Sequence, residues 1–334
     1  MKKIICIAIA FCILFATPVI AENNSEYSAE VEKLIGEEIV FTDEIVTFSF
    51  QKARNNQSIT LNLVGMSSYL DFSSMDSSFD ATLVEYESSN PEVAVAWNGR
   101  ILARGVGTAQ ITINYLDLQQ IIDVTVKKEI SSELKEALEY SVYTQNSTRA
   151  VVPQERLDII YKASDMVTVQ WTPTQSLVGW NNEMSYEPGN IYFGVPYSQS
   201  VNQVDDIEFS SALSNGDFYD AYSRFSIQMP KYGSDCSGFV SIAWGINRIT
   251  TSTFYNNYPS IGDFTELQTG DAVVSTQDRH IILVSTNYET PPGGSSYTEP
   301  YLVCFEQLQY DADLTFHTYA QLSRLGYKAI SKFN

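Results

Sequence analysis

Histidine, cysteine and basic residues are all scarce in this chain of 334 residues. The only two histidines are His280 and His317, and with four cysteines they offer no known spacing of zinc ligands. Against 40 acidic residues there are only 20 basic ones, and the formal charge is −20. This charge excludes a nucleic-acid binder that neutralises phosphates, and it opposes docking on an anionic membrane surface. The absence of HExxH, GxxxxGK[ST] and GxGxxG motifs excludes metalloprotease, P-loop and dinucleotide-binding functions.

The N-terminus has no hydrophobic run long enough to span a membrane. Its apolar stretch from Ile4 to Ala16 is too short for a bilayer about 30 Å thick. Two lysines precede this stretch, and Pro18 and Ala21 follow it. This order of charged, apolar and small residues is typical of a secretory signal peptide. We therefore expect residues 1–21 to be a signal peptide, and the protein to be bacterial and either secreted or associated with the cell wall.

A period of two, typical of β-strands, extends over residues 40–128, after a polar N-terminal segment at residues 22–39. Asn98-Gly99 is a strong signal for a two-residue hairpin. Two later strands carry alternating apolar side chains, at Ala109, Ile111, Ile113 and Tyr115, and at Ile122, Val124 and Val126. Short strands with turns at this spacing predict an all-β sandwich.

A polar linker over residues 129–153 separates the predicted sandwich from a second hydrophobic pattern over residues 154–334. An amphipathic helix begins this second region and ends before Trp171-Thr172-Pro173, because proline disfavours helix at the residue before it. Its predicted apolar face carries Leu157, Ile160, Tyr161 and Val167. Because each region has a complete hydrophobic pattern, we expect the N-terminal one to act independently of any chemistry in the other.

Candidate chemistry lies around Cys236, where apolar residues at helical spacing predict a buried helix that begins close to the cysteine. They are Phe239, Ile242, Ala243, Ile246 and Ile249. Asp235 and Ser237 are good N-terminal capping residues. A cysteine at this position experiences the positive end of the helix dipole, which favours the nucleophilic thiolate. The alternative is a buried structural cysteine, although the small and polar neighbours are unlike a core position.

A cysteine nucleophile needs an imidazole as its base. Residues 270–275 predict a strand, residues 276–279 a turn, and His280 begins the second strand of a hairpin, with Ile282 and Val284 on its own face. His280 lies 44 positions after Cys236, so only folding can bring the two together. His317 stands in a segment without a comparable motif, and we interpret it as a surface or packing histidine.

The motif Asp-Cys-Ser-Gly-Phe-Val at a helix start, then Gly-Asp before one strand and His at the start of the next, resembles the NlpC-type papain-like cysteine peptidases of bacterial cell walls. The resemblance covers about residues 150–334. It implies an α+β papain-like catalytic domain in which an antiparallel sheet packs on helices. It also implies that Cys236 is the nucleophile and His280 the base.

A third residue in this family orients the imidazole from the following strand, which corresponds to Tyr301–Gln307. Glu306 and Gln307 are adjacent there and face opposite sides of a strand, so only one can hold the ring. Both faces are apolar, and the pattern alone does not decide between them. We favour Glu306 because a carboxylate stabilises an imidazolium better, although the family more often has His, Asn or Gln at this place.

Three further residues resemble the substrate-binding positions of the family. Tyr197 stands in the aromatic and glycine segment before the nucleophile and corresponds to a tyrosine near the oxyanion site, or it packs in a turn. The usual Trp-Gly-Gly continuation is absent, and about 40 residues separate Tyr197 from Cys236, more than is common. Asp235 and Ser237 resemble residues that meet the free amine of a stem peptide, or they only cap the helix.

The N-terminal region also resembles a known domain. Ser88-Ser89-Asn90-Pro91-Glu92-Val93-Ala94, Asn98-Gly99 and Gly107-Thr108-Ala109 resemble the bacterial immunoglobulin-like domain, group 2, over roughly residues 40–128. Such domains are often spacers in surface proteins and sometimes bind ligands. Both roles are open for this chain.

Taken together, these patterns predict an exported cysteine hydrolase that cleaves amide bonds of peptidoglycan stem peptides, with Cys236, His280 and Glu306 as catalytic residues. The bond between D-glutamate and a diamino acid is the commonest target in the family. The chemistry implies no cofactor and no metal, and we expect no nucleic-acid partner and no membrane contact after signal cleavage. One alternative is an amidase or acyltransferase on a non-wall substrate. Another is a non-catalytic wall-binding surface protein.

Overall fold

The computed structural model describes residues 57–72, 83–97, 99–134, 152–182, 185–289 and 299–333, with positions 34, 46–47, 75 and 79–80. The predicted signal peptide and nearly all of the predicted polar segment lie outside the described residues. Over its described ranges the chain is a mixed α/β protein with several sheets. No helix among these residues is long and apolar enough to cross a membrane.

The N-terminal region forms two four-stranded sheets, ordered β1-β3-β6-β5 and β2-β8-β7-β4. Their strands are β1 (Val46–Thr47), β2 (Gln57–Leu63), β3 (Ser67–Asp71), β4 (Val84–Ser88), β5 (Ala94–Trp97), β6 (Arg100–Ala103), β7 (Gly107–Tyr115) and β8 (Leu118–Lys128). The predicted hairpin is confirmed, because β5 and β6 pair in antiparallel fashion and Trp97 and Arg100 form the last pair before the turn. Gly99 has a φ of +75° in this turn, a conformation that glycine adopts without strain.

Both N-terminal sheets contribute to one hydrophobic core. The apolar side chains expected on β7 and β8 are all part of it, namely Ala109, Ile111, Ile113, Tyr115, Ile122, Val124 and Val126. The predicted alternation is therefore confirmed for these two strands. Leu134, inside the predicted linker, is fully buried in the same core, and most of the remaining predicted linker lies outside the described residues.

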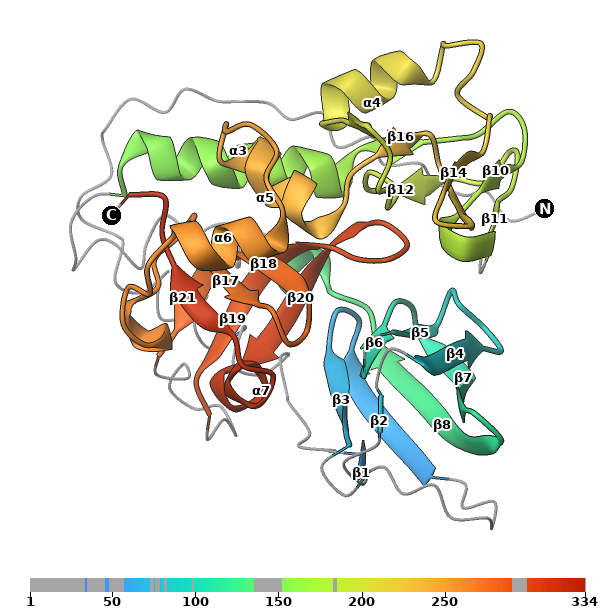
Figure 1. The fold of residues 1–334 in the computed structure, drawn as a ribbon, viewed down its shortest axis with the longest axis horizontal. Helices are drawn as coiled ribbons and strands as arrows, with labels where there is room; N and C mark the ends of the chain where they lie inside the picture. Colours follow the sequence, from blue (N-terminus) through green and yellow to red (C-terminus); the bar gives the residue numbers. More distant parts are fainter. Residues whose placement is uncertain are drawn as a thin grey trace.

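The C-terminal region is built on an antiparallel five-stranded sheet, ordered β20-β19-β18-β17-β21. Its strands are β17 (Ala272–Ser275), β18 (His280–Tyr288), β19 (Tyr301–Gln307), β20 (Ala312–Thr318) and β21 (Lys328–Ile330). Figure 1 shows α3 (Gln154–Thr168), α5 (Cys236–Ala243) and α6 (Thr251–Asn257) gathered along this sheet. The helical turns α7 (Tyr319–Arg324) and η3 (Phe264–Glu266) pack against its other face through a second apolar cluster.

The strand β18 shows the predicted division of its faces. Ile281 and Leu283 pack in the same cluster as α3 and α5, while Ile282 and Val284 belong to the cluster on the opposite face. Alternation therefore places His280 on the face of Ile282 and Val284, as the sequence predicted.

Short elements fill the chain between α3 and α5. They are β9 (Gln170–Trp171), β10 (Leu177–Val178), η2 (Trp180–Asn182), β11 (Ser185–Tyr186), β12 (Tyr192–Phe193), β13 (Asn202–Gln203), α4 (Asp206–Ala212), β14 (Tyr222–Arg224), β15 (Ile227–Met229) and β16 (Tyr232–Gly233). The strand β16 pairs in parallel with β13 and leads directly into the start of α5.

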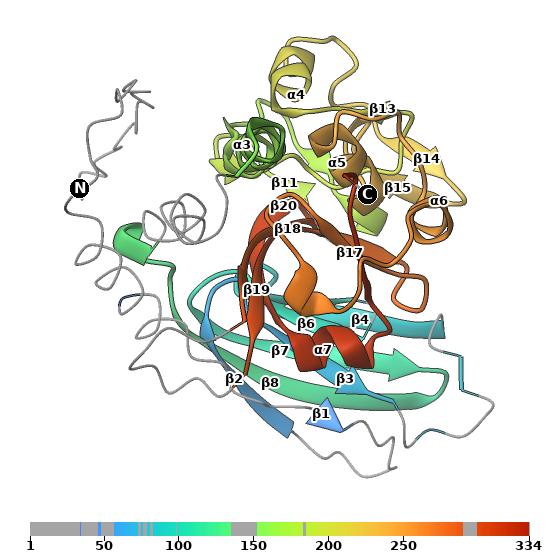
Figure 2. The same cartoon turned by 90° about the vertical axis from the view of Figure 1, so that its left-hand side faces the viewer.

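The two regions pack against each other, so their separate hydrophobic patterns do not correspond to two separate cores. Tyr301, Val303 and Phe316 of the C-terminal sheet belong to the same apolar core as the N-terminal sheets. The Phe316 N–H also donates to the Gly65 carbonyl at 3.3 Å. Figure 2 shows β19 and β20 lying against the layer formed by the N-terminal strands. The sequence pattern did not predict this contact. Apolar residues on both faces of a strand show that both faces are covered, but not which part of the chain covers each.

Two helices differ from their sequence expectation. In α3 the predicted Ile160 and Val167 are buried, together with Ile159, Ala163 and Met166, whereas Tyr161 is 43% exposed because it lies nearly half a turn from the centre of that face. The helix ends at Thr168, before Pro173, as predicted.

The helix α5 is shorter than the predicted apolar pattern. It ends at Ala243, and Gly245 follows with a φ of +61°. A left-handed glycine is a common way to end a helix. Ile246 and Ile249 therefore lie beyond the helix and pack only partly against its core.

Candidate active site

Cys236 is the first residue of α5, and the backbone enters the helix through Asp235. The Asp235 Oδ1 atom accepts the N–H of Gly238 at 2.6 Å and the hydroxyl of Ser237 at 2.8 Å. A side-chain cap of this kind contributes about 1 kcal/mol to helix stability. The predicted capping by Asp235 is therefore present. It holds Cys236 at the helix end where unpaired N–H groups concentrate positive charge.

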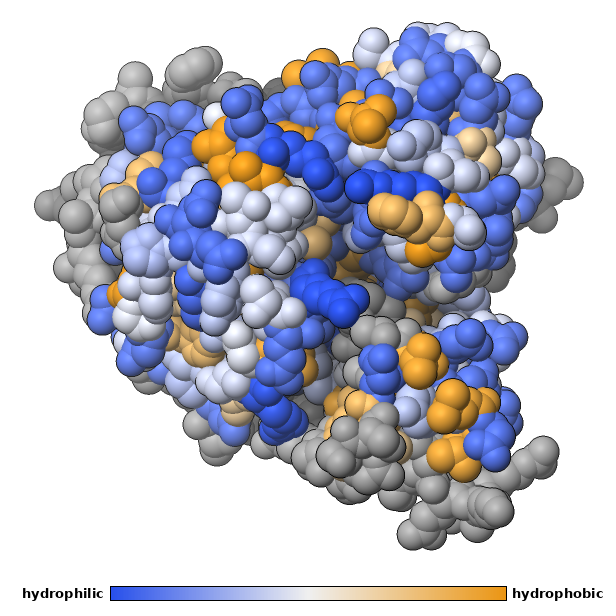
Figure 3. All heavy atoms as spheres, viewed as in Figure 1, coloured by the Kyte–Doolittle hydropathy of each residue, from blue (hydrophilic) through white to orange (hydrophobic). Residues whose placement is uncertain are grey.

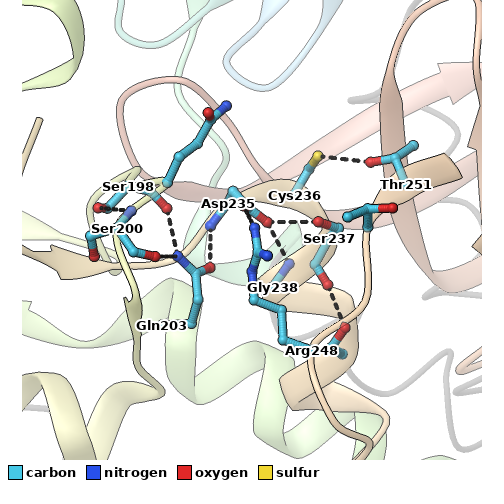
Figure 4. A network of polar contacts seen from close by, with 12 residues as sticks. Ser198, Ser200, Gln203, Asp235, Cys236, Ser237, Gly238, Arg248 and Thr251 are labelled. Atoms are coloured by element: carbon cyan, nitrogen blue, oxygen red, sulfur yellow. Dashed lines mark hydrogen bonds and ion pairs between the residues drawn. The ribbon is translucent and has the colours of Figure 1, made fainter. Parts of the chain in front are cut away.

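Gln203, which the sequence did not single out, supports the approach to this helix (Figure 4). Its Oε1 accepts the N–H of Asp235 at 2.8 Å, and its Nε2 donates to the carbonyls of Ser198 and Ser200 at 2.8 and 2.9 Å. A Cβ on Gly238 would lie only 2.0 Å from Gln203 Oε1. Glycine is therefore needed two positions after Cys236 so that Gln203 can reach the backbone.

His280 lies against Cys236, although 44 positions separate them in the chain. Its Nε2 is 2.7 Å from Glu306 Oε1, which leaves Nδ1 for the hydrogen bond to the sulfur of Cys236. Burial lowers the pKa of His280, but the negative charges of Cys236 and Glu306 outweigh it and raise the pKa from 6.5 to about 10. The imidazole is therefore protonated at neutral pH and ready to donate.

Glu306 is the residue of β19 that faces this imidazole. Its carboxylate is fully buried and accepts from four side chains. Oε1 accepts from Arg100 Nη2 at 2.6 Å and from His280, and Oε2 accepts from Thr315 Oγ1 at 2.7 Å and from His317 Nε2 at 3.0 Å. Burial raises the pKa of Glu306, but Arg100 and the two histidines outweigh it and hold the pKa well below 4.5. The group is a carboxylate throughout the neutral range.

Gln307 faces the other side of β19 and does not meet the imidazole. Its Oε1 accepts the hydroxyl of Ser234, and its Nε2 donates to the Val195 carbonyl at 3.0 Å. Gln307 therefore braces the segment that leads to Cys236. Of the two candidates on this strand, Glu306 is the one in position to orient His280.

His317 is not a surface residue and does more than pack, which corrects the sequence interpretation. It is fully buried, with Nε2 on Glu306 and Nδ1 3.0 Å from the hydroxyl of Tyr69. Burial lowers the pKa of His317, so the ring is neutral. Since a carboxylate only accepts, Nε2 carries the proton and Nδ1 accepts the Tyr69 hydroxyl. Both histidines of the chain thus converge on one carboxylate.

A cavity of about 400 Å³ opens beside Cys236. The predicted substrate-side residues Tyr197, Asp235 and Ser237 all line it. Three arginines that the sequence did not single out line it as well, at positions 224, 248 and 279. Figure 3 shows strongly hydrophilic side chains around the hollow in the middle of this face. On the helix side, Thr251 Oγ1 lies 3.7 Å from Cys236 Sγ.

Tyr197 is held at the cavity by its neighbours. Its hydroxyl accepts from Gln199 Nε2 at 2.9 Å, and its ring meets Trp180 edge to face at 4.9 Å. Burial, together with the negative charges of Cys236 and Asp235, raises the pKa of Tyr197 well above 10. The phenol therefore stays protonated and can donate to an oxygen atom inside the cavity.

Asp235 is already engaged by protein groups. Besides its two capping bonds, its Oδ2 forms an ion pair with Arg248, and its side chain is only 7% exposed. Ser237 donates its hydroxyl to the same carboxylate. Asp235 therefore caps the helix, Ser237 is bonded to that cap, and little of either side chain is free to receive a substrate amine.

The two cysteines among the described residues differ in their surroundings, although both are free. Cys236 lines the cavity, whereas Cys304 lies fully buried among apolar side chains. Burial raises the pKa of Cys304 well above 9.0. We expect iodoacetamide to label Cys236 at least about tenfold faster than Cys304, because alkylation needs an accessible thiolate. Mass spectrometry of tryptic peptides measures both rates, and equal rates would contradict the assignment of Cys236 as the reactive thiol.

Within the described ranges, no group of three or more histidine, cysteine, aspartate or glutamate side chains is arranged to hold a metal ion. The arrangement instead combines a cysteine at a helix start, a protonated imidazole and a carboxylate that fixes the ring. Such a set can attack a carbonyl carbon and protonate the leaving group.

No family model, no curated protein and no solved structure matches this chain.

Proposed function

We propose that this chain is an exported bacterial cysteine hydrolase of the NlpC type that cleaves amide bonds in peptidoglycan stem peptides. The arrangement of three side chains carries the proposal. Cys236 begins a capped helix, and His280 hydrogen-bonds to the Cys236 sulfur. Glu306 holds the other nitrogen of the same imidazole at 2.7 Å. The helix α5 on an antiparallel sheet, with the base on one strand and the acid on the next, supports a papain-like catalytic domain.

The reaction would begin when the Cys236 thiolate attacks the amide carbonyl and a C–S bond forms. The Cys236 N–H and the Tyr197 hydroxyl would donate to the resulting oxyanion. His280 then gives its proton to the amine as the C–N bond breaks, which leaves a thioester on Cys236. Water attacks the thioester while His280 takes a proton from it. The carboxylic acid leaves, and the thiolate and imidazolium are restored.

The charge of the cavity supports a substrate that carries free carboxylates. Three of the nine arginines of this acidic chain line the cavity, and its one acidic residue, Asp235, is paired with Arg248. Stem peptides contain free carboxylates at D-glutamate and at the diamino acid. Phe225 forms part of the rim at the tip of the β14–β15 hairpin and is 82% exposed. The free-amine recognition implied for Asp235 by the family resemblance is less well supported.

Replacing Arg279 with glutamine should raise KM for an anionic stem peptide roughly two- to fivefold while kcat changes little. The reason is that an exposed ionic contact contributes about 1 kcal/mol or less. Steady-state kinetics on a stem peptide and on its carboxamide analogue measure the effect, which should vanish for the neutral analogue. Arg324, exposed at the end of α7 and not part of the cavity lining, provides the control R324Q. An unchanged KM in R279Q would remove this arginine from substrate recognition.

Digestion of purified muropeptides followed by mass spectrometry tests the main proposal. The expected products are two fragments whose summed mass exceeds that of the substrate by one water. Transfer to an added amine in place of hydrolysis would favour the acyltransferase alternative, and the same arrangement of Cys236 and His280 could support it. Binding to sacculi without cleavage would favour a wall-binding surface protein. Export is part of the proposal and depends on residues 1–21, which lie outside the described residues.

The two N-terminal sheets with their common core support an immunoglobulin-like sandwich. Their contacts with β19 and β20 oppose a role as a detached spacer.

A further inference from the structure

The N-terminal sheets place two polar side chains against the buried end of the catalytic network. Tyr69 on β3 and Arg100 on β6 stand directly opposite each other in the β3–β6 ladder. Arg100 Nη2 donates to Glu306 Oε1 at 2.6 Å, and the Tyr69 hydroxyl reaches His317 Nδ1 at 3.0 Å. The side chains of Arg100 and Glu306 are 1% and 0% exposed. A guanidinium so deeply buried is rarely kept without a partner that needs its charge.

We propose that Arg100 and Tyr69 are positioning residues for the catalytic carboxylate, so that the N-terminal sheets complete the active site. This inference rests on the proposed function, because it assigns to Glu306 the task of holding His280. It goes beyond that function by making a second region of the chain a working part of the site.

The charges around Glu306 give the physical reason. Arg100 from β6 and His280 from β18 are cationic, Cys236 lies beside His280, and neutral His317 donates from β20. The neutral groups Thr315 and Tyr69 complete the set, while Asp278, Tyr327 and Cys304 lie close enough to act on Arg100 or Tyr69.

Arg100 provides the one permanent positive charge among the groups that contact Glu306. Both histidines can lose or gain a proton, but a guanidinium stays charged. Arg100 therefore keeps Glu306 ionised while His280 passes its proton to and from substrate. Tyr69 fixes the His317 tautomer that donates to the same carboxylate. Without Arg100, protonation of Glu306 would remove the acceptor that orients His280.

A second ion pair between the regions serves as a matched control. Arg104, just after β6, pairs with Asp311 at 2.6 Å, and the two side chains are 11% and 12% exposed. Its guanidinium also lies over the Tyr310 ring at 5.2 Å. This pair joins the same two regions but does not contact Glu306 or either histidine. If Arg100 only held the two regions together, replacing Arg100 or Arg104 would therefore have similar effects on kcat.

The experiment compares R100M with R104M in the full chain. We expect R100M to lower kcat on a stem peptide roughly 10- to 100-fold with little change in KM, because a misplaced general acid loses part of the roughly 10²- to 10⁴-fold that proton transfer contributes. R104M should keep kcat within roughly twofold of the wild type. Equal losses in the two variants, or an unchanged kcat in R100M, would overturn the proposal.

Histidine-ring NMR supplies a readout that does not depend on the substrate, and the chain has only two histidines to assign. Arg100 lowers the pKa of His317, so R100M should raise it, while R104M should leave it unchanged. If the wild type cleaves no stem peptide but this shift occurs in R100M, the proposed substrate fails and the positioning role holds. If the shift does not occur, the positioning role fails.

A milder variant covers the case in which R100M does not fold. Y69F keeps the ring and removes only the hydroxyl that His317 Nδ1 accepts. We expect Y69F to fold, to change the His317 tautomer signals and to lower kcat roughly two- to fivefold, about the effect of one hydrogen bond. Wild-type ring signals and an unchanged kcat in Y69F would count against the proposal.

Discussion

Turnover should fall to the uncatalysed background when Cys236 is replaced by alanine, while the thermal transition changes by only a few degrees. No other described cysteine lines the cavity, so the covalent step has no substitute thiol. Stability should survive because the thiol does not cap the helix. That task belongs to Asp235, and alanine is the best helix former. Product formation from muropeptides and a melting curve measure both effects.

Cys304 is the matched control for this change. It is fully buried in an apolar cluster, so C304A should retain most of the turnover and lose roughly 1–2 kcal/mol of stability through the small cavity it leaves. Full activity in C236A would show that Cys236 is not the nucleophile. Inactivity of both variants with intact folds would show that the cavity is not the only place where a thiol matters.

The second large effect is expected for His280→Ala, which should lower kcat by roughly three or more orders of magnitude. The variant loses both the cation beside the thiolate and the proton donor for the leaving amine. His317→Ala should cost much less, because it removes one of four donors to Glu306 and leaves the imidazole at Cys236 in place. Steady-state kinetics with circular dichroism as a folding control separates the two. If His317 were essential and His280 dispensable, the assignment of the base would be reversed.

The pH profile of the wild type follows from the same imidazole. The pKa of His280 is raised from 6.5 to about 10 in the folded protein. Its protonated form therefore contributes stability that is fully present below pH 6.5 and is lost as the pH rises toward 10. Activity should likewise persist into the alkaline range and decline near pH 10 as the proton donor disappears. His280→Ala should abolish the alkaline loss of stability, which urea titrations at several pH values can measure.

The parts of the site that the sequence predicted are those set by local pattern. Asp235 and the apolar spacing after it place Cys236 at a helix start. A hairpin turn places His280 at the start of β18. The family resemblance places the orienting residue on β19, alternation puts the polar neighbours Glu306 and Gln307 on opposite faces, and the structure distinguishes them through their partners.

The contacts that the sequence did not predict join residues far apart in the chain. Arg100 and Glu306 are 206 positions apart, and Tyr69 and His317 are 248. Neither pair has a local signature, since Arg100 follows a hairpin turn and resembles any solvent-facing arginine there. His317 could have been suspected, because alternation on β20 places it on the face of Thr315 and away from Phe316. Recognising its partner requires the register of β19 and β20, which side-chain pattern alone does not provide.

The distance along the chain between Arg100 and Glu306 also determines when the proposed site becomes complete during synthesis of the chain. Residues of β3 and β6 leave the ribosome long before β19 and β20. More than 200 further residues must be synthesised after Arg100 before Glu306 can accept its hydrogen bond. A chain synthesised only as far as Cys236 has the nucleophile but neither histidine, and one that stops before β20 lacks two donors to Glu306. The proposed site is thus incomplete until nearly the last strand is in place. If the chain is a wall hydrolase as proposed, the order of synthesis itself delays the assembly of its active site.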